Sequence, residues 1–222
     1  AQAQQWAADS MAQFTTRLYA FFGLAPFAAR AQEPLFATLP AWVPDPSCSL
    51  STTHYLSSIL GSLTDTLGEF KSLAIPGVTQ RLEALVLDVR FQFTEVLCCL
   101  WLRDARLCHH LENWAPNSQQ PAITSYLFSL SVFNRWNARE GFYIADSRAR
   151  MQGTPTAHDT QVLAAFSARL KATFVQALYA FLEGIVAAAL SPDAGAAWEA
   201  RAVDASARPT APDRVRTATD AG

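Results

Sequence analysis

The chain has 222 residues, a formal net charge of −2 and four cysteines. This charge gives no basic surface for nucleic acid or an anionic membrane, so we expect no nucleic-acid partner. Half of the residues are hydrophobic and only 16% are charged, against roughly 25% in a typical soluble domain. More of the surface than usual is therefore expected to lie against neighbouring segments or partner chains.

The first residues predict a short helix followed by an irregular connector. Apolar residues in the range 4–22 recur at helical spacing, and Gly23 and Pro26 close the helix. The prolines of residues 23–50 lack an amide donor and disfavour helix, which predicts an extended segment. Bulky side chains such as Trp42 indicate that this segment lies in a groove between helices. We assign residues 1–45 to an N-terminal helix and a Pro-rich connector.

Two longer helices follow. Ser51 or Thr52 is expected to cap the first of them, and Pro76 and Gly77 end it in an antiparallel turn. Its predicted inner face consists of Leu56, Ile59, Leu60, Leu63, Leu67 and Phe70. From 78 to 114 apolar residues recur in steps of three and four, which predicts one helix of roughly 54 Å. A stripe of that length must be covered by other helices.

Two further helices complete the expected bundle. Pro121 suits the first turn of a fourth helix, with an inner face of Ile123, Tyr126, Leu127, Leu130, Phe133 and Trp136. Asp159 or Thr156 could cap a fifth, whose inner face would be Leu163, Phe166, Leu170, Phe174, Leu178, Phe181, Ile185 and Leu190. The sequence thus predicts an all-α fold, an elongated antiparallel bundle of about five helices that counts the first one, and it assigns residues 46–190 to the helical bundle. Residues 191–222 have almost no bulky apolar side chains, so we expect a disordered tail.

Asp104 is unusual because it lies on the apolar stripe of the long helix, about 20° from Leu97 and Leu111 on a helical wheel. A buried carboxylate without a partner is strongly disfavoured. We expect either a partly exposed polar notch or an ion pair with another helix, with Arg135 or Arg139 as the candidate partner.

Few residues suggest chemistry. Cys108, His109, His110 and Glu112 form a polar cluster, but only Cys108 and Glu112 have the spacing that lets two metal ligands share a helix face. His54 and His158 are isolated. Cys98 and Cys99 point about 100° apart on a helix, which is typical of free thiols in a reducing compartment. We therefore predict no catalytic, cofactor-binding or metal-binding residues, no cofactor, and no enzyme activity.

The range 174–190 approaches the length of a membrane span and has only Gln176 and Glu183 as polar residues. A Glu near the middle of a span is costly in lipid. The preceding residues 169–173 continue the same amphipathic period, which favours a helix buried in the bundle.

Several phrases of the sequence resemble one protein family. They are DPSCSLSTTHYLSSILGSLTDTL at 45–67, then RLEALVLDVRFQFTEVLCCLWLRDARLCHHLENW at 81–114, which includes Asp88 and Arg90 before an apolar run, and FVQALYAFLEGIV at 174–186. Together they resemble the Sec5 family of exocyst subunits (exocyst complex component two), and the last phrase is similar to fungal members. The resemblance covers roughly residues 45–190. The chain lacks an initiator Met and a signal peptide, so we expect an internal fragment of a longer protein.

The resemblance implies a rod-like, non-enzymatic scaffold that tethers secretory vesicles to the plasma membrane before fusion. It implies other exocyst subunits as partners in a hetero-oligomer, indirect contact with the vesicle and plasma membrane, and a cytoplasmic location at sites of secretion. The immunoglobulin-like domain by which animal members bind a small GTPase has no counterpart here.

Two alternatives remain open from the residues. One is a subunit of a Golgi or endosomal tethering complex. The other is a helical ligand-binding protein or small enzyme, with Phe133, Trp136, Phe142 and Tyr143 lining a pocket, although aromatic residues at helical spacing usually form core.

Overall fold

The computed structural model describes residues 2–73, 77–146 and 157–190. Within these ranges the fold consists of helices without a strand, which confirms the predicted all-α class. The elements are α1 (Gln2–Phe22), α2 (Phe27–Arg30), α3 (Ser49–Ser72), α4 (Val78–Leu107), the 3-10 turn η1 (Cys108–Leu111), α5 (Ser125–Ala145) and α6 (Ala157–Leu190). The expected tail at 191–222 lies outside the described residues.

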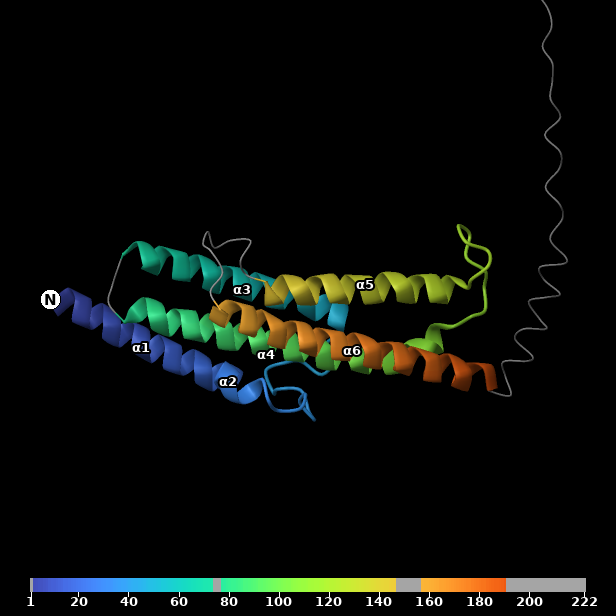
Figure 1. Cartoon of the computed structure of the whole chain (residues 1–222), viewed down its shortest axis with the longest axis horizontal. Coiled ribbons are helices and arrows are strands. Elements are labelled where there is room, and N and C mark those ends of the chain that lie inside the picture. The colour runs from blue at the N-terminus through green and yellow to red at the C-terminus, as the bar shows by residue number, and fades with distance from the viewer. Residues whose placement is uncertain (1, 74–76, 147–156, 191–222) are drawn as a thin grey trace, which may run out of the picture.

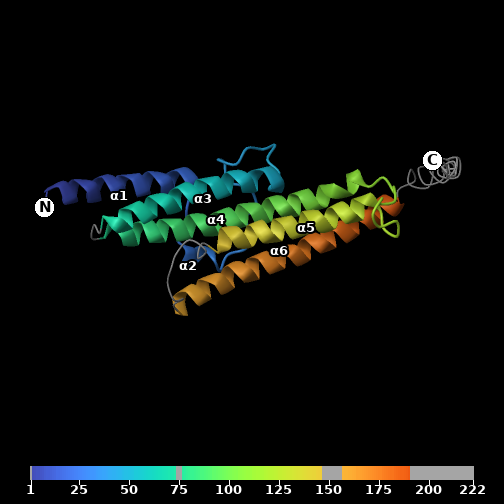
Figure 2. The ribbon, with the colours of Figure 1, turned by 90° about the horizontal axis from the view of Figure 1, so that it is seen from above.

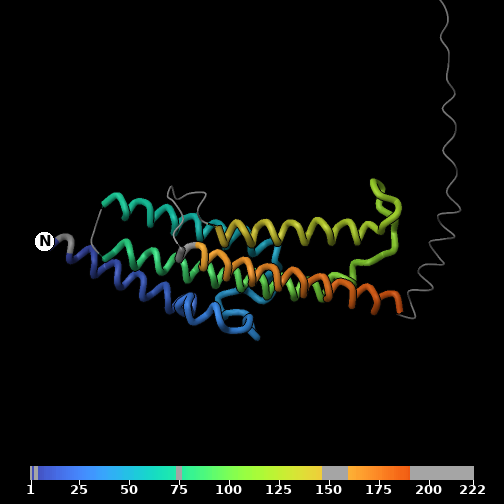
Figure 3. Tube along the Cα trace, in the orientation of Figure 1, coloured from blue at the N-terminus to red at the C-terminus, as the bar shows by residue number. Residues whose placement is uncertain are grey.

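The helices form an elongated bundle around α4 (Figure 1). α1, α4 and α6 run in one direction, and α3 and α5 run in the other. α1 and α3 flank the first part of α4, which we call the N-terminal half, whereas α5 and α6 flank the second part, the C-terminal half (Figure 2). The start of α1 and the end of α6 lie at opposite ends of the rod (Figure 3).

α1 ends where the sequence predicts, at Phe22. Gly23 has φ +61°, a conformation that costs glycine little. The Leu24 amide donates to the Tyr19 carbonyl at 2.9 Å, which closes the helix with the hydrogen bond of a Schellman turn.

α3 begins two residues before the predicted cap. Cys48 occupies the N-cap position and makes no side-chain capping bond, while Ser51 and Thr52 lie inside the helix, so the predicted cap is wrong. Most of the predicted inner face packs inward, but Ile59 is 37% exposed. The Thr64 hydroxyl is buried instead and donates to the Leu60 carbonyl.

α4 is shorter than predicted. Its 30 residues make about 45 Å of α-helix, and the chain then tightens into η1 and leaves the helix. Trp114 has φ +56°, which excludes it from a right-handed helix. The Glu112 carboxylate stabilises this exit because it accepts from the Trp114 amide at 2.6 Å.

α5 also begins later than predicted. Pro121 lies in a loop, and the helix starts at Ser125 after Thr124, whose hydroxyl accepts from the Leu127 amide at 3.2 Å. Leu127 is on the exposed side, whereas the buried positions include Asn134 and Asn137. The Asn134 side chain accepts from the Trp101 indole at 2.9 Å, and this bond makes a buried amide acceptable.

α6 begins at Ala157, so Asp159 is not its N-cap, and Thr156 lies outside the described residues. Its inner face differs from the predicted one and consists of Val162, Phe166, Leu170, Thr173, Ala177, Phe181 and Gly184. Phe174, Leu178 and Leu190, which were expected to point inward, are exposed by 36% to 79%.

Small residues explain this rotation. A Cβ on Gly184 would lie 2.7 Å from the Cβ of His109, and one on Gly141 would lie 2.5 Å from a Leu170 methyl group. Glycine therefore permits close approach of α6 to η1 and of α5 to α6. Bulky side chains cannot fit at these two glycine positions, and Phe174, Leu178 and Leu190 lie on the outside of α6.

Candidate functional site

One face of α4 holds the chain between α1 and α3. We call its side chains the α4 ladder: Asp88, Gln92, Glu95, Cys99, Arg103 and Asp104. The first five are three or four residues apart, so they share a helix face. Apart from Gln92, which bonds to the end of α1, their partners in residues 27–49 follow in the same order along the chain, and the connector therefore runs parallel to α4.

The N-terminal part of the α4 ladder anchors the end of α1. The Asp88 carboxylate accepts from the Tyr19 hydroxyl and from the Phe27 amide at 2.7 Å. Burial raises the pKa of Asp88, and these two hydrogen bonds oppose that shift. The Gln92 amide donates to the Phe22 carbonyl at 2.6 Å, which satisfies a carbonyl that the helix end leaves without a partner.

The middle of the ladder is a buried ion triad. The Glu95 side chain is fully buried, and its oxygens lie 2.6 Å from Arg30 Nε and 3.2 Å from Arg169 Nη2. Burial raises the pKa of Glu95, while both guanidinium groups lower it. Because Arg30 belongs to α2 and Arg169 to α6, this Glu95 triad joins the connector, α4 and α6 at one point.

Further contacts hold the two arginines of the triad in place. The Arg30 guanidinium lies 4.0 Å from the centre of the Phe36 ring, a cation–π contact. The Arg169 guanidinium also donates to the Glu33 carbonyl at 2.7 Å. Burial lowers the pKa of Arg30, but the bonds to Glu95 and Glu33 raise it by more, so this guanidinium stays charged.

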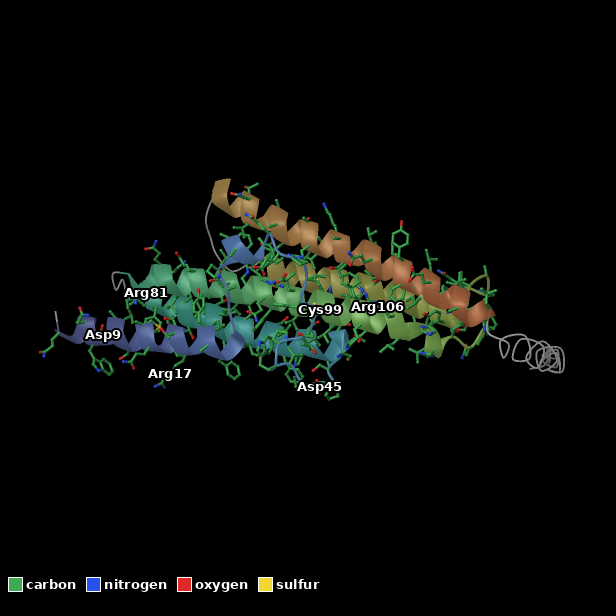
Figure 4. The ribbon with its side chains drawn as sticks, turned by 90° about the horizontal axis from the view of Figure 1, so that it is seen from below. Asp9, Arg17, Asp45, Arg81, Cys99 and Arg106 are labelled. Atoms are coloured by element: carbon green, nitrogen blue, oxygen red, sulfur yellow. The ribbon has the colours of Figure 1, made fainter. Side chains whose placement is uncertain are left out.

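The C-terminal part of the α4 ladder fixes the rest of the connector. The Cys99 thiol donates to the Phe36 carbonyl at 3.7 Å, and Arg103 donates to the carbonyls of Asp45 and Ser47. Figure 4 shows Cys99 near the middle of the rod and Asp45 in the connector beside the start of α3. Side chains of α4 thus hold the connector through hydrogen bonds to its backbone, in agreement with its predicted place in a groove between helices.

Asp104 caps α3 from a distance. Its carboxylate accepts from the Ser49 amide at 2.6 Å, so the prediction of Arg135 or Arg139 as its partner is wrong; Arg139 pairs with Glu140 at 2.7 Å. The first amides of a helix lack partners and carry a partial positive charge. Since Cys48 supplies no cap, a carboxylate from α4 takes that role.

The polar cluster after α4 is structural. The Glu112 carboxylate accepts from the Thr124 hydroxyl at 2.9 Å, and His109 Nδ1 lies 2.8 Å from the Arg106 carbonyl. Within residues 2–73, 77–146 and 157–190, no group of three or more His, Cys, Asp or Glu side chains could hold a metal ion. His54 is exposed beside Tyr55, and the His158 side chain lies outside the described part.

The cysteines are all free thiols. Cys98 is fully buried, and burial raises its pKa to about 12; burial likewise raises the pKa of Cys99 to about 11. Since the thiolate is the reactive form, neither group is activated as a nucleophile near neutral pH.

The aromatic residues proposed for a ligand pocket on α5 do not converge. Phe133 packs against Phe181 with ring centres 6.1 Å apart. Phe142 and Tyr143 are 39% and 48% exposed on the outside of the rod. These positions therefore give no support to a shared binding chamber.

The side of α6 that points away from α4 is apolar and exposed. We call it the α6 outer face: Ala168, Lys171, Ala172, Val175, Tyr179, Leu182, Glu183 and Val186. Its four large apolar side chains are 49% to 64% exposed. The sequence pattern placed α6 in the bundle but did not predict this face. The signal that could have found it is the run of small inward residues at helical spacing, from Thr173 through Ala177 to Gly184.

Thr160–Leu190 is long and apolar enough to cross a membrane by length and composition, a test that a core helix of a soluble protein also passes. In the structure its inner face packs on α4, α5 and η1, and Arg169 reaches the buried Glu95. These contacts are those of a bundle helix.

Comparison with known protein families identifies the family of this chain. The model of the family described as exocyst complex component Sec5 matches residues 1–208. No curated protein and no solved structure matches the chain.

Proposed function

The chain belongs to the Sec5 family of exocyst components, and we propose that it serves the exocyst as a stiff helical strut. Family membership implies vesicle tethering in exocytosis, carried out by a non-enzymatic protein. A tether works by holding two bodies at a distance, so the property to explain is how a single chain forms an extended rod that does not bend at its middle.

The Glu95 triad is the observation that supports this proposal. Glu95 lies at the middle of the rod, where the N-terminal half gives way to the C-terminal half. Arg30 reaches it from the first half and Arg169 from the second. A bend there would separate a buried carboxylate from its cations, which costs several kcal/mol. Because α4 also passes through both halves without a break, the rod has a continuous spine.

The family implies membership of the exocyst complex and peripheral association at sites of secretion. We infer further that the partners are other exocyst subunits in a hetero-oligomer and that contact with vesicle and plasma membrane is indirect. We also infer a cytoplasmic location and a fungal-type member, the latter from the phrase at 174–186. The absence of a nucleic-acid partner stays a prediction, made from the net charge of −2.

Affinity purification tests this assignment. The tagged protein, expressed in its native cells and captured at moderate salt, is expected to bring down exocyst subunits that mass spectrometry identifies. Reciprocal capture through a second subunit should recover this chain. Recovery of Golgi or endosomal tether subunits in place of exocyst subunits would contradict the proposal and select the alternative complex.

A second measurement tests stiffness. Labels at Arg17 in α1 and Ala187 in α6, both exposed and in opposite halves of the rod, should give one narrow distance distribution by electron–electron double resonance. Replacement of Glu95 by Gln should broaden it, since the joint between the halves is weakened. A broad distribution in the unaltered chain would exclude a stiff strut.

A further inference from the structure

We propose that α1 and the connector form a releasable arm, which stays docked on α4 at rest and detaches in two steps when the rod is pulled along its axis. We define the arm as residues 2–48. The inference rests on the proposed strut, because a tether that joins two bodies is loaded along its length. It goes beyond the strut by assigning the first response to that load to one part of the chain.

The arm lies in the path of a load applied at the two ends of the rod. α1 starts at one end of the rod and α6 stops at the other (Figure 3). The main helix contact of α1 is with α4, and the two helices run in the same direction (Figure 1). A load on the start of α1 therefore pulls the arm along the surface of α4, and the contacts between them carry it as long as the arm stays docked.

α1 is held by fewer buried side chains than the helix at the other end. Among its described side chains, Met11, Thr15 and Phe22 are buried. The described side chains of α6 include seven buried ones, among them Phe166 and Phe181. A segment with few buried apolar contacts opens at a lower free energy than the rest of the fold. The arm should therefore detach before α6 does.

The first anchor of the arm lies at the end of α1. The Tyr19 hydroxyl donates to Asp88, and the Phe22 carbonyl accepts from the Gln92 amide at 2.6 Å. The Phe22 ring also packs edge-on against Phe93, with ring centres 5.5 Å apart. A load on the start of α1 strains these contacts first, and after they break it passes to the connector.

The second anchor is the Glu95 triad. Arg30 bonds to Glu95 at 2.6 Å, and Arg169 of α6 holds the backbone of the same segment through the Glu33 carbonyl at 2.7 Å. Separating a buried carboxylate from its cation is costly, so the detachment of the arm should pause here.

Beyond Arg30 the connector has weaker anchors. They are the bond from the Cys99 thiol to the Phe36 carbonyl and the bonds from Arg103 to carbonyls of the connector. A thiol is a weak donor. α3, which begins at Ser49, has seven buried residues, so detachment should stop at its start.

The lengths of the two steps follow from chain geometry. Freeing residues 5–30 gives about 88 Å of extended chain in place of about 30 Å along the docked arm. Freeing residues 30–49 gives about 66 Å of chain in place of the about 14 Å between Glu95 and Asp104 on α4. Each step should therefore lengthen the molecule by between about 50 and 60 Å.

Force spectroscopy on the full chain tests the proposal. Handles are attached in optical tweezers through unnatural amino acids at Gln5 and Ala187, both exposed, so that the four cysteines stay in place. Two lengthening events of the stated size should precede unfolding of the remaining bundle. On relaxation the arm should dock again.

Single substitutions separate the two anchors. Tyr19→Phe removes the hydrogen bond to Asp88 and keeps the ring, and the first event should become about tenfold faster at the same force. Arg30→Gln removes the cation of the arm and leaves Glu95 paired with Arg169, so the pause should be lost and the two events should merge into one. Arg17→Gln, on the exposed side of α1, is the matched control and should change neither event.

A change of handle position controls for the direction of the load. Arg81 is exposed at the start of α4 (Figure 4). With handles at Arg81 and Ala187 the arm is outside the load path, so both early events should disappear. Circular dichroism without load should show that every variant is folded. Early events that persist with the handle at Arg81, or one event that unfolds the whole bundle from Gln5, would overturn the proposal.

The affinity purification above distinguishes failure of the arm from failure of the proposed function. A chain that captures exocyst subunits but shows no early event keeps its place in the exocyst and has no releasable arm. A chain that shows both early events but captures no exocyst subunit has the arm, and the proposed function is then wrong.

Discussion

In the N-terminal half of the rod, α3 covers α4 with leucines, whereas in the C-terminal half α6 covers the same helix with small side chains placed between large ones. Leu56, Leu60 and Leu67 of α3 are buried, and half of the exposed residues of that helix are Ser, Asp or Glu. In α6, small residues such as Ala177 point inward between large ones such as Phe166 and Phe181, while the large apolar residues of the α6 outer face point outward. The comparison teaches that a helix can complete a core with one side and still present an apolar surface on the other.

The largest effect is expected where both halves depend on the same helix. Phe93 and Leu97 are fully buried on α4. Replacing both with Asp would bury two carboxylates without partners, which should cost more than about 5 kcal/mol and unfold the chain. Circular dichroism and thermal melting would measure this. Val132→Asp, on the exposed side of α5, is the control and should change the melting temperature little; a folded double variant would show that α4 is not the shared spine.

The joint between the halves should give the next largest effect. Glu95→Gln removes the buried counter-charge that Arg30 and Arg169 share and leaves Arg30 with only the exposed Glu33 carboxylate, and we expect a loss of about 2–4 kcal/mol in the free energy of unfolding at neutral pH. Denaturant titration would measure the loss. If the triad joins the halves, the variant should also unfold in a broader transition. An unchanged, sharp transition would mean that the halves are held together elsewhere.

The pH dependence of this variant has a defined sign. The pKa of Glu95 in the folded protein lies above its usual value of 4.5, so as pH falls the folded state takes up the proton first. The free energy of unfolding that this group contributes therefore rises as pH falls toward 4.5 and decreases as pH rises through the raised pKa. The stability difference between the unaltered chain and Glu95→Gln should widen between pH 7 and pH 4.5. A difference that narrows would contradict the direction of the shift.

Glycine replacements should have opposite signs in the two halves. Gly184→Ala places a Cβ 2.7 Å from the Cβ of His109, and we expect a loss of about 1–3 kcal/mol because α6 must move away from η1. Gly68→Ala, in α3, meets nothing within 4 Å and should gain about 0.5–1 kcal/mol from helix propensity. Melting curves of both variants measure the contrast. Equal effects would show that α6 does not pack closely.

The cap on α3 should give a smaller change. Asp104→Ala removes the acceptor for the Ser49 amide, and we expect a loss of about 1 kcal/mol. Amide hydrogen exchange should show faster exchange in the first turn of α3, while α6 keeps its protection. Protection that falls equally in both helices would show that the bond acts on the whole rod.

The smallest effect is expected at the end of the chain. Removing residues 191–222 should leave the melting temperature nearly unchanged, since the sequence there offers few apolar side chains for packing. A large fall would show that the segment contributes to the bundle. The proposed division of the chain at residues 45 and 190 rests on the same composition argument and stays a prediction.

The sequence predicted the helices well where local signals are strong. Gly23 readily adopts the positive φ that ends a helix, so it predicts the end of α1 correctly. The apolar period of α4 likewise predicts a long central helix. That period continues through Leu111, however, and it therefore predicted a helix past Leu107, where the exit depends on hydrogen bonds from the Trp114 amide and the Thr124 hydroxyl to the Glu112 carboxylate.

Tertiary contacts account for what could not be predicted. The partner of Asp104 is a backbone amide, which no side-chain pattern indicates. The inner face of α6 depends on Gly141 and Gly184, whose value lies in the close approach of another helix. The periodicity argument uses only the large residues of α6. It therefore predicted that Phe174 and Leu178 point inward, and it did not predict the α6 outer face.

The place of the Glu95 triad in the chain has a consequence for biosynthesis. Arg30 precedes Glu95 by 65 residues, and Arg169 emerges from the ribosome long after both. A nascent chain can therefore assemble its first three long helices while the carboxylate is neutralised by one guanidinium on one side only. α6 then supplies the second cation, so the joint between the two halves can close only after α6 has been synthesised.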